Sequence, residues 1–170
     1  MQIFHGSEEI IKNPQFGFGN PRNDYGLGFY CTKSHELAKE WACQKNKDGF
    51  SNCYELKTEG LSVLDLSEAN FSILHWLSIL MQNRVFSPKS PLGKQNLDFL
   101  VSHYNLAYSD YDIIIGYRAN DSYFSFARYI ARDTSARKSY LENLRNQKPE
   151  SSTYLIDIVR NPELLNDLHL

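Results

Sequence analysis

Cysteine and long apolar runs are both scarce in this sequence. The 170 residues include three cysteines, Cys31, Cys43 and Cys53, and none of them has metal-ligand spacing. An odd, sparse set of this kind is typical of a reducing compartment. No apolar stretch approaches the roughly 20 residues of a membrane-spanning helix, and no charged leader or cleavage site precedes the first apolar run. We therefore expect a soluble, cytoplasmic protein without a membrane partner.

An excess of basic charge is also absent. The chain has 18 Lys and Arg against 20 Asp and Glu, which gives a net charge of -2. Clustered basic residues supply sequence-independent affinity for nucleic acid, so a strongly basic nucleic-acid binder is excluded, whereas binding of one nucleotide is not. The sequence also lacks the P-loop, the dinucleotide-binding glycine motif, H-E-x-x-H, C-x-x-C and G-x-S-x-G. These absences remove the common phosphate, dinucleotide, metal and serine-hydrolase motifs.

Aromatic residues, by contrast, are plentiful. They make up 14% of the chain, with 11 Tyr, 10 Phe and 2 Trp, and their flat faces either fill a core or stack on a planar ligand. Hydrophobic residues account for 42% and charged residues for 22%, which is typical of a globular protein. The length suits one domain, so we expect residues 1–170 to form a single domain.

The order of apolar and turn-forming segments predicts the fold class. We expect strands at 3–5, 28–32, 53–56, 61–66, 111–116 and 154–159, and helices at 36–44, 71–82, 92–104, 121–132 and 135–147, with a short helix after Pro162. Thr32 or Ser34 is expected to cap the first helix. Because strands and helices do not alternate regularly, the pattern favours an α+β fold with an antiparallel or split sheet.

Two segments are candidates for a binding site. One is Phe4-His5-Gly6-Ser7 at the end of the first strand, and the other is the run 24–32, which is followed by Trp41 eleven residues after Tyr30. Between them, residues 14–28 contain six Gly and Pro residues, which punctuate loops. Long ordered loops in compact domains are usually functional. We expect the two segments to converge and to form a slot for a planar ligand.

These segments resemble the NAD-binding core of the ADP-ribosyltransferase superfamily, in its His-Tyr-Glu branch. More closely, the chain is similar to a bacterial family of unknown function, DUF3990, that is assigned to this superfamily. The matching stretches are 5–7, 23–32, 37–41 and 111–126. The resemblance implies an ADP-ribosyltransferase-like split antiparallel β-sheet core with flanking helices, NAD as co-substrate and no metal.

The resemblance also implies roles for individual residues. NAD is cleaved between nicotinamide and ribose through an oxocarbenium-like state, so the site must hold the nicotinamide flat and offset positive charge on the sugar. The backbone of Gly6 would meet the carboxamide, and His5 would bind the adenosine ribose. Tyr30 and Trp41 would sandwich the nicotinamide ring. Further candidate contacts to NAD are Ser7, Thr32 and Asp24.

The catalytic carboxylate is less clearly marked. The family's third element is a carboxylate at the start of a late strand, and Glu150 is the acidic residue just before the expected strand 154–159. Asp121 is a second acidic candidate, at the start of the expected helix 121–132. We therefore count Tyr30, Glu150 and Asp121 as candidate catalytic residues.

Each of these residues also has a purely structural interpretation. His5 is an ordinary core or edge histidine in that reading, and Tyr30 and Trp41 are core side chains. Asp121 would then serve as helix N-cap or first-turn charge, and Glu150 as a solvated loop residue. Their combination, rather than any single residue, carries the functional interpretation.

The function predicted from the resemblance is NAD-dependent mono-ADP-ribosylation of a macromolecular or nucleotide acceptor. Family analogy and small size further suggest the toxin of a bacterial toxin–antitoxin pair, with an antitoxin protein as partner. Two alternatives stay open. One is an NAD glycohydrolase with water as acceptor, and the other is a non-catalytic module that binds NAD or ADP-ribose. The acceptor, protein or nucleic acid, is not indicated by the sequence.

Overall fold

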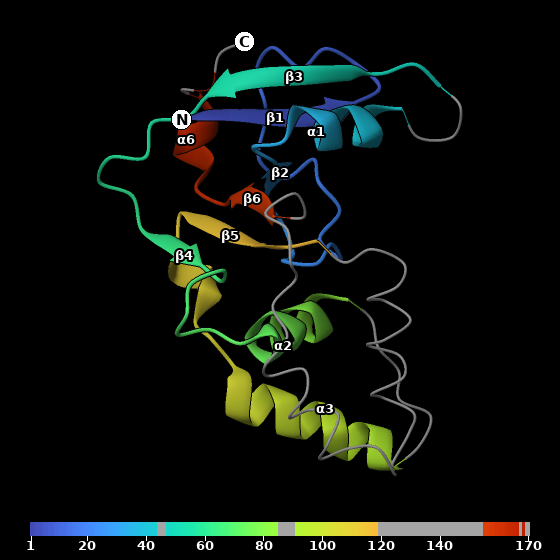
Figure 1. The fold of residues 1–170 in the computed structure, drawn as a ribbon, viewed down its shortest axis with the longest axis vertical. Coiled ribbons are helices and arrows are strands. Elements are labelled where there is room, and N and C mark those ends of the chain that lie inside the picture. The colour runs from blue at the N-terminus through green and yellow to red at the C-terminus, as the bar shows by residue number, and fades with distance from the viewer. Residues whose placement is uncertain (44–46, 85–90, 119–154, 167, 169–170) are drawn as a thin grey trace.

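Six strands form two sheets in the computed structural model, which describes residues 1–43, 47–84, 91–118, 155–166 and 168 (Figure 1). The smaller sheet pairs β1 (Gln2–Ser7) with β3 (Phe50–Glu55) in antiparallel register. The larger sheet has the order β2-β6-β5-β4, with β2 at Phe29–Cys31, β6 at Leu155–Val159, β5 at Ile113–Tyr117 and β4 at Val63–Asp65. The expected strands are therefore present, with bounds that shift by up to three residues.

The larger sheet is mixed rather than antiparallel. β2 with β6 and β5 with β6 pair antiparallel, but β4 pairs parallel with β5. The expectation of an antiparallel sheet is wrong for this pair. A parallel return needs a long crossover connection, and here the chain between β4 and β5 contains the helices α2 (Ile73–Asn83) and α3 (Pro91–Tyr104) and the short 3-10 turn Tyr108–Asp110. The presence of helices beside these sheets confirms the α+β class.

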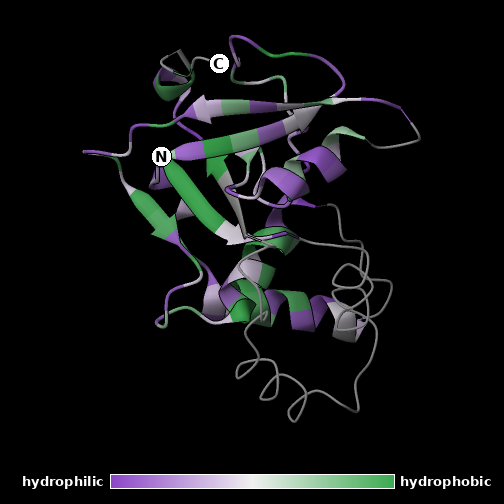
Figure 2. Ribbon diagram, turned by 45° about the horizontal axis from the view of Figure 1, so that its top comes forward, coloured by the Kyte–Doolittle hydropathy of each residue, from purple (hydrophilic) through white to green (hydrophobic). Residues whose placement is uncertain are grey.

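Hydrophobic cores lie on both faces of the larger sheet. Because side chains alternate along a strand, Ile114 and Ile158 face one core together with α2 and Leu100 of α3, whereas Ile113 and Val159 face the other. The second core also includes residues of β1 and β3 and Leu165 of α6 (Pro162–Asn166). Figure 2 shows the central strands of this sheet as largely hydrophobic, in contrast to the mostly hydrophilic α1 (His35–Ala42).

The first helix begins where the sequence indicates. Ser34 is the N-cap of α1, and its Oγ accepts a hydrogen bond from the Leu37 backbone N–H at 3.2 Å. α1 packs on β1 and β3, where Ala38 and Ala42 lie against Gly6, and its Leu37 is buried in the core that contains α2. The expected helices 36–44, 71–82 and 92–104 correspond to α1, α2 and α3, and residues 14–28 have neither helix nor strand. The helices expected at 121–132 and 135–147 lie outside the described residues.

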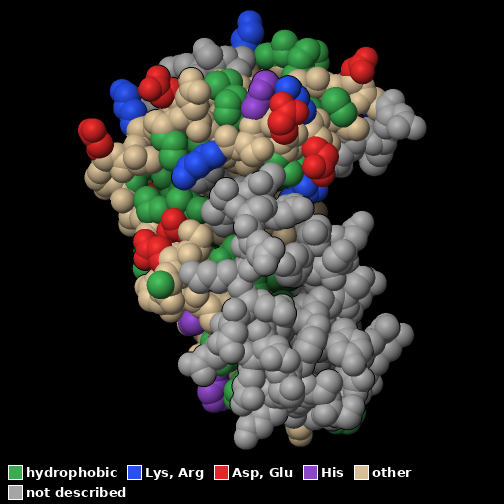
Figure 3. All heavy atoms as spheres, in the orientation of Figure 1, with side chains coloured by type: hydrophobic (Ala, Val, Ile, Leu, Met, Phe, Trp, Pro, Cys, Tyr) green, Lys and Arg blue, Asp and Glu red, His purple; other side chains and the backbone are tan. Residues whose placement is uncertain are grey.

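Charge is mixed on the surface of this fold. On the face drawn in Figure 3, Lys, Arg, Asp and Glu side chains alternate over the part that holds the strands and α1. Within the described part of the chain, no helix is long and apolar enough to cross a membrane. Over the same residues, no three His, Cys, Asp or Glu side chains gather as metal ligands.

Candidate functional site

The two sheets meet at a single bridge between β1 and the end of β2. The Phe4 N–H donates to the Thr32 carbonyl at 2.8 Å, and the Thr32 N–H donates to the Phe4 carbonyl at 2.9 Å. If the antiparallel ladder continued, Gly6 would lie opposite Tyr30. The bridge is isolated, however, so the two strands separate at this point. The result is a gap in the backbone pairing between the two segments that the sequence marks.

The side chain of His5 crosses this gap. Its Nδ1 lies 2.7 Å from the carbonyl oxygen of Tyr30. A carbonyl only accepts, so Nδ1 carries the proton in this hydrogen bond and the neutral ring keeps a lone pair on Nε2. Burial lowers the pKa of His5, which favours the neutral ring. His5 therefore holds β1 to β2 with one nitrogen and offers a hydrogen-bond acceptor with the other.

The backbone of Gly6 faces the same gap. Along a strand, the N–H and C=O groups of alternate residues point to the same side. Those of Phe4 point to β2 at Thr32, whereas the Met1 carbonyl bonds to Leu56 on the β3 side. The N–H and C=O of Gly6 therefore point toward β2, at the place where the ladder stops. One donor and one acceptor side by side match the edge of a primary carboxamide.

Close helix packing explains why residue 6 is glycine. A Cβ at Gly6 would lie 2.0 Å from the carbonyl oxygen of Ala38, 2.7 Å from the Ala42 nitrogen and 2.9 Å from the Cβ of Trp41. The backbone of α1 thus approaches β1 as closely as a strand without a side chain permits. This contact also brings Trp41 next to the gap.

The ring of Trp41 is covered on one face by a cation. The guanidinium carbon of Arg118, which follows β5, lies 5.4 Å from the Trp41 ring centroid, a cation–π distance. Arg118 also forms an ion pair with Glu40 at 3.2 Å. The Nε1 atom of Trp41 is buried and has no hydrogen-bond partner within the described part of the chain. Trp41 therefore carries a cation on one ring face and has a buried N–H that is not hydrogen-bonded to any described residue.

Tyr30 is fixed by the loop that precedes it. Its hydroxyl donates to the Gly26 carbonyl at 2.7 Å and accepts from the Tyr25 N–H at 3.1 Å. Burial raises the pKa of Tyr30 well above its ordinary value, and the nearby Asp24 charge adds to this shift. Tyr30 therefore stays a neutral phenol at physiological pH. It provides a rigid ring, and its catalytic role stays a prediction.

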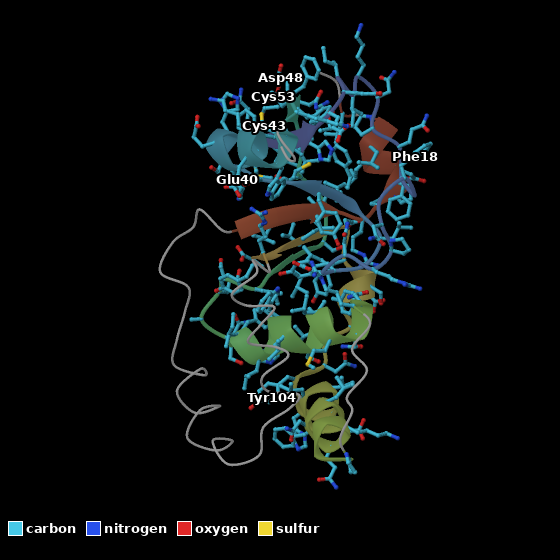
Figure 4. All side chains as sticks on the ribbon, turned by 90° about the vertical axis from the view of Figure 1, so that its right-hand side faces the viewer. Phe18, Glu40, Cys43, Asp48, Cys53 and Tyr104 are labelled. Atoms are coloured by element: carbon cyan, nitrogen blue, oxygen red, sulfur yellow. The ribbon has the colours of Figure 1, made fainter. Side chains whose placement is uncertain are left out.

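A cavity of about 420 Å³ lies on the other face of β1. Its lining residues are His5, Ile11, Asn13, Pro14, Gln15, Phe18, Gly19, Asn23, Gly28, Phe29 and Tyr30. Most of them belong to the loop between β1 and β2. Since neighbouring side chains on a strand point to opposite faces, His5 faces this cavity and Gly6 faces α1. In Figure 4, Phe18 of the cavity and Glu40 of α1 accordingly lie at opposite sides of the molecule.

The polar candidates Asp24, Ser7 and Thr32 have partners of their own. The Asp24 carboxylate is buried and forms an ion pair with Arg84, the C-cap residue of α2. The Ser7 hydroxyl accepts from Asn52 Nδ2 at 2.9 Å and donates to the Glu9 carbonyl. Thr32 is buried, and its Oγ1 accepts from the Ser34 N–H at 3.1 Å. These contacts order the loop and the start of α1, and the proposed contacts of these side chains with NAD stay predictions.

The sequence did not mark several residues that build the site. Buried Asn52 ties the chain after β1 in place, because its Nδ2 donates to the His5 carbonyl and its Oδ1 accepts from the Ile11 N–H. Arg118 and Phe18 lie within segments that the sequence marks, 111–126 and 14–28, but no role in the site was predicted for either residue. Asp121 and Glu150, the candidate carboxylates, lie outside the described residues.

One comparison identifies relatives of this chain. A family model described as "Protein of unknown function (DUF3990)" matches residues 1–160. Searches of curated proteins and of solved structures found no match. The family match spans β1, the loop, α1 and all strands of both sheets, and it confirms the membership expected from the residues around His5 and Tyr30. The chain belongs to the DUF3990 family.

Proposed function

We propose that this protein is an NAD-dependent mono-ADP-ribosyltransferase with an ADP-ribosyltransferase-like split sheet. One observation carries the proposal: β1 and β2 part at Gly6 and Tyr30, and the imidazole of His5 bridges the opening. The resemblance of the same two segments to the NAD-binding core of that superfamily supports it further. NAD is the substrate that both lines of argument favour.

The residues around the gap suit the nicotinamide end of NAD. The Gly6 N–H and C=O would bind the carboxamide. The positively charged pyridinium ring would stack on the ring face of Trp41 that the Arg118 guanidinium covers in this structure. The acceptor nitrogen Nε2 of His5 would take a ribose hydroxyl. The bond between nicotinamide and ribose then breaks with nicotinamide as leaving group, and positive charge develops on the sugar.

A carboxylate is needed to offset that charge. Glu150 and Asp121 remain the candidates, and Glu150 precedes β6, the strand that pairs with β2 beside the gap. Glu150→Gln and Asp121→Asn change one charge each and little volume. We expect the variant that removes the catalytic carboxylate to bind NAD with unchanged affinity and to lose nearly all turnover, and the other variant to keep both.

The cellular role is part of the proposal. Small size and the family resemblance support a bacterial, cytoplasmic toxin that is held inactive by an antitoxin protein. The acceptor that receives ADP-ribose is a protein, a nucleic acid or a nucleotide. Because a positively charged surface is not needed to bind one nucleotide, the net charge of -2 is compatible with this role.

The test is incubation of the full chain with NAD labelled in its adenylate half, with and without bacterial lysate. We expect nicotinamide release together with label on a lysate component, and loss of both in His5→Ala. Equal release without lysate identifies an NAD glycohydrolase instead. Binding of NAD by calorimetry without release over hours identifies a binding module. If the chain neither binds nor cleaves NAD, the proposal is wrong.

A further inference from the structure

Phe18 stands exposed at the cavity behind His5. Its side chain is 85% accessible to solvent, yet the residue lines the cavity together with His5, Phe29 and Tyr30. An exposed phenylalanine forgoes about 2 kcal/mol that burial would supply. Gly17, with a φ of +95°, and Gly19 flank it, so the backbone on both sides is free of Cβ atoms. A large apolar ring on such a hinge can turn toward the cavity at little steric cost.

A stacked aromatic pair, His5 and Phe29, forms a wall of the same cavity. The rings of His5 and Phe29 are stacked, with centroids 4.5 Å apart and an angle of 30° between planes. Phe29 is buried and is further supported edge-on by Tyr54, whose ring centroid is 5.7 Å away. The wall is therefore fixed, whereas Phe18, which lines the same cavity, is exposed to solvent.

The chemistry of the remaining lining selects a neutral ligand. Asn13, Gln15 and Asn23 contribute amide groups, and among the described residues none that lines the cavity is Lys, Arg, Asp or Glu. Amides both donate and accept, which matches the edge of a nucleobase, while phosphate would call for cations. A volume of about 420 Å³ falls within the usual range of small-ligand sites. A planar base with a hydrogen-bonding edge fits these features best.

We propose that Phe18 is a stacking lid that closes on the adenine base of NAD, against the wall formed by Phe29 and His5. This inference rests on the proposed function, because NAD supplies the adenine. It adds a specificity-determining residue at the end of the ligand remote from the bond that breaks. Phe18 gains its missing apolar contacts only when the base is bound, and the two glycines permit the movement.

Calorimetric titration with AMP, ADP-ribose and nicotinamide mononucleotide tests the lid. We expect Phe18→Ala to weaken the binding of AMP and ADP-ribose by about 2- to 12-fold, the range of one aromatic stacking contact. Phe18→Tyr keeps an aromatic ring and should bind both ligands as the parent does. Nicotinamide mononucleotide lacks adenine, so its affinity should not change. Phe50→Ala is the matched control, because Phe50 is also exposed, at 47%, and does not line the cavity.

A second measurement reports stacking directly. In Phe18→Trp, AMP should quench the fluorescence of the new indole, and the parent protein provides the baseline. Equal AMP affinity in the parent and in Phe18→Ala, or no AMP binding by the parent, overturns the lid. The proposed function is tested separately. If AMP binding depends on Phe18 but nicotinamide is never released, the lid proposal is supported and the transferase activity is contradicted. If the protein is a transferase but its AMP affinity is the same in Phe18→Ala, the lid proposal is wrong.

Discussion

The imidazole of His5 donates from Nδ1 to the backbone carbonyl of Tyr30, at 2.7 Å, across the point where β1 and β2 separate. A side chain thus replaces the ladder hydrogen bond that the Gly6 N–H would make in a continuous sheet. The pair assigns separate tasks to the two nitrogens of the ring. Nδ1 holds the strands together, and Nε2 is left to accept a hydrogen bond from a ligand.

The first prediction separates these two tasks. In His5→Asn, the side-chain amide can place an N–H near the position of Nδ1 but has nothing at the position of Nε2. We expect His5→Asn to stay within about 1 kcal/mol of the parent in free energy of unfolding, the worth of one hydrogen bond, and to lose NAD affinity. His5→Ala should lose both stability and NAD affinity, because the Tyr30 carbonyl loses its hydrogen-bond donor and the Phe29 ring loses its stacking partner.

Urea unfolding measures stability, and calorimetry measures NAD affinity. His103→Asn serves as the control, since His103 lies exposed near the end of α3 and should affect neither quantity. If His5→Asn binds NAD as the parent does, then Nε2 has no ligand and His5 is only a structural residue.

The second prediction concerns pH. Burial lowers the pKa of His5 below the ordinary value of 6.5, so the unfolded chain binds more protons than the folded chain below that pH. The stability that the neutral ring contributes is complete above pH 6.5 and is lost as the pH falls through the folded pKa. We expect the difference in free energy of unfolding between the parent and His5→Asn to shift against the parent on acidification, by at most about 1.4 kcal/mol per pH unit.

The comparison of parent and variant in urea, from pH 7.5 to 5 at steps of about half a unit, isolates His5 from the other histidines. A difference that is independent of pH, or one that moves in favour of the parent in acid, contradicts this prediction. In that case the ring would be protonated or solvent-exposed in the folded chain.

The sequence allowed a large part of this site to be predicted. The strand ending in His5-Gly6 and the strand containing Tyr30 were expected to converge, and the His5–Tyr30 hydrogen bond confirms that they do. Local patterns sufficed because turn-forming glycines, the Ser34 cap and the β-branched run of β5 determine the elements. The binding roles of these residues stay predictions.

Long-range partners could not be predicted. The ion pair of Arg84 with Asp24 and the cation–π contact of Arg118 with Trp41 join residues far apart in the sequence. Only the folded topology brings them together. The parallel pairing of β4 and β5 was missed for the same reason, since it depends on how the intervening helices α2 and α3 pack. Phe18 is one of several aromatic residues in its loop, and its exposure is visible only in three dimensions.

The third prediction tests the contact between β1 and α1. Gly6→Ala places a Cβ against the backbone of Ala38 and Ala42, which cannot shift without moving the helix. We expect destabilisation at or above the upper end of the roughly 1–3 kcal/mol typical of overpacking, with loss of amide hydrogen-exchange protection in α1. NAD binding should also be lost, because Trp41 moves with the helix.

Gly60→Ala is the control for that substitution. Gly60 has a φ of +79°, but nothing lies within 4 Å of its Cβ position, so alanine there strains only the local turn. It should lower stability without changing α1 protection or NAD affinity. If protection of α1 in Gly6→Ala equals that of the parent, the helix does not rest on Gly6.

The fourth prediction concerns the cation on Trp41. Under the proposed function, the pyridinium ring of NAD and the guanidinium of Arg118 compete for the same aromatic face. Arg118→Gln should therefore tighten the binding of oxidised NAD by about 2- to 5-fold, the range of an exposed cation–π contact. Reduced NADH carries a neutral ring and should gain less. Tryptophan fluorescence quenching measures both affinities.

Lys57→Gln provides the matched loss of one positive charge, because Lys57 is exposed and follows β3. Its NAD affinity should equal that of the parent. Weaker NAD binding in Arg118→Gln would instead assign Arg118 to the ligand, as a partner of its phosphates. Unchanged NAD affinity would contradict the stacking of the nicotinamide ring on Trp41.

The fifth prediction decides what Asp24 does. Its carboxylate is 7% exposed and faces Arg84, which is 31% exposed, so the pair joins the loop before β2 to the end of α2. Removing one partner leaves the other charge partly buried, and Asp24→Asn should cost on the order of 3 kcal/mol in free energy of unfolding. Arg84→Gln should cost a similar amount, and the double variant should cost much less than the sum, because both charges of the pair are then removed together.

The same variants measure ligand binding independently of stability. If Asp24 acts only through the loop, then the double variant Asp24→Asn with Arg84→Gln should regain NAD affinity relative to Asp24→Asn alone, since the charge that Asp24 balances next to the loop that holds the Tyr30 hydroxyl is then removed as well. If Asp24 contacts NAD directly, affinity stays low whenever Asp24 is replaced, whatever residue occupies position 84. Calorimetry on the four proteins of this cycle therefore distinguishes a loop-ordering carboxylate from a ligand-binding one.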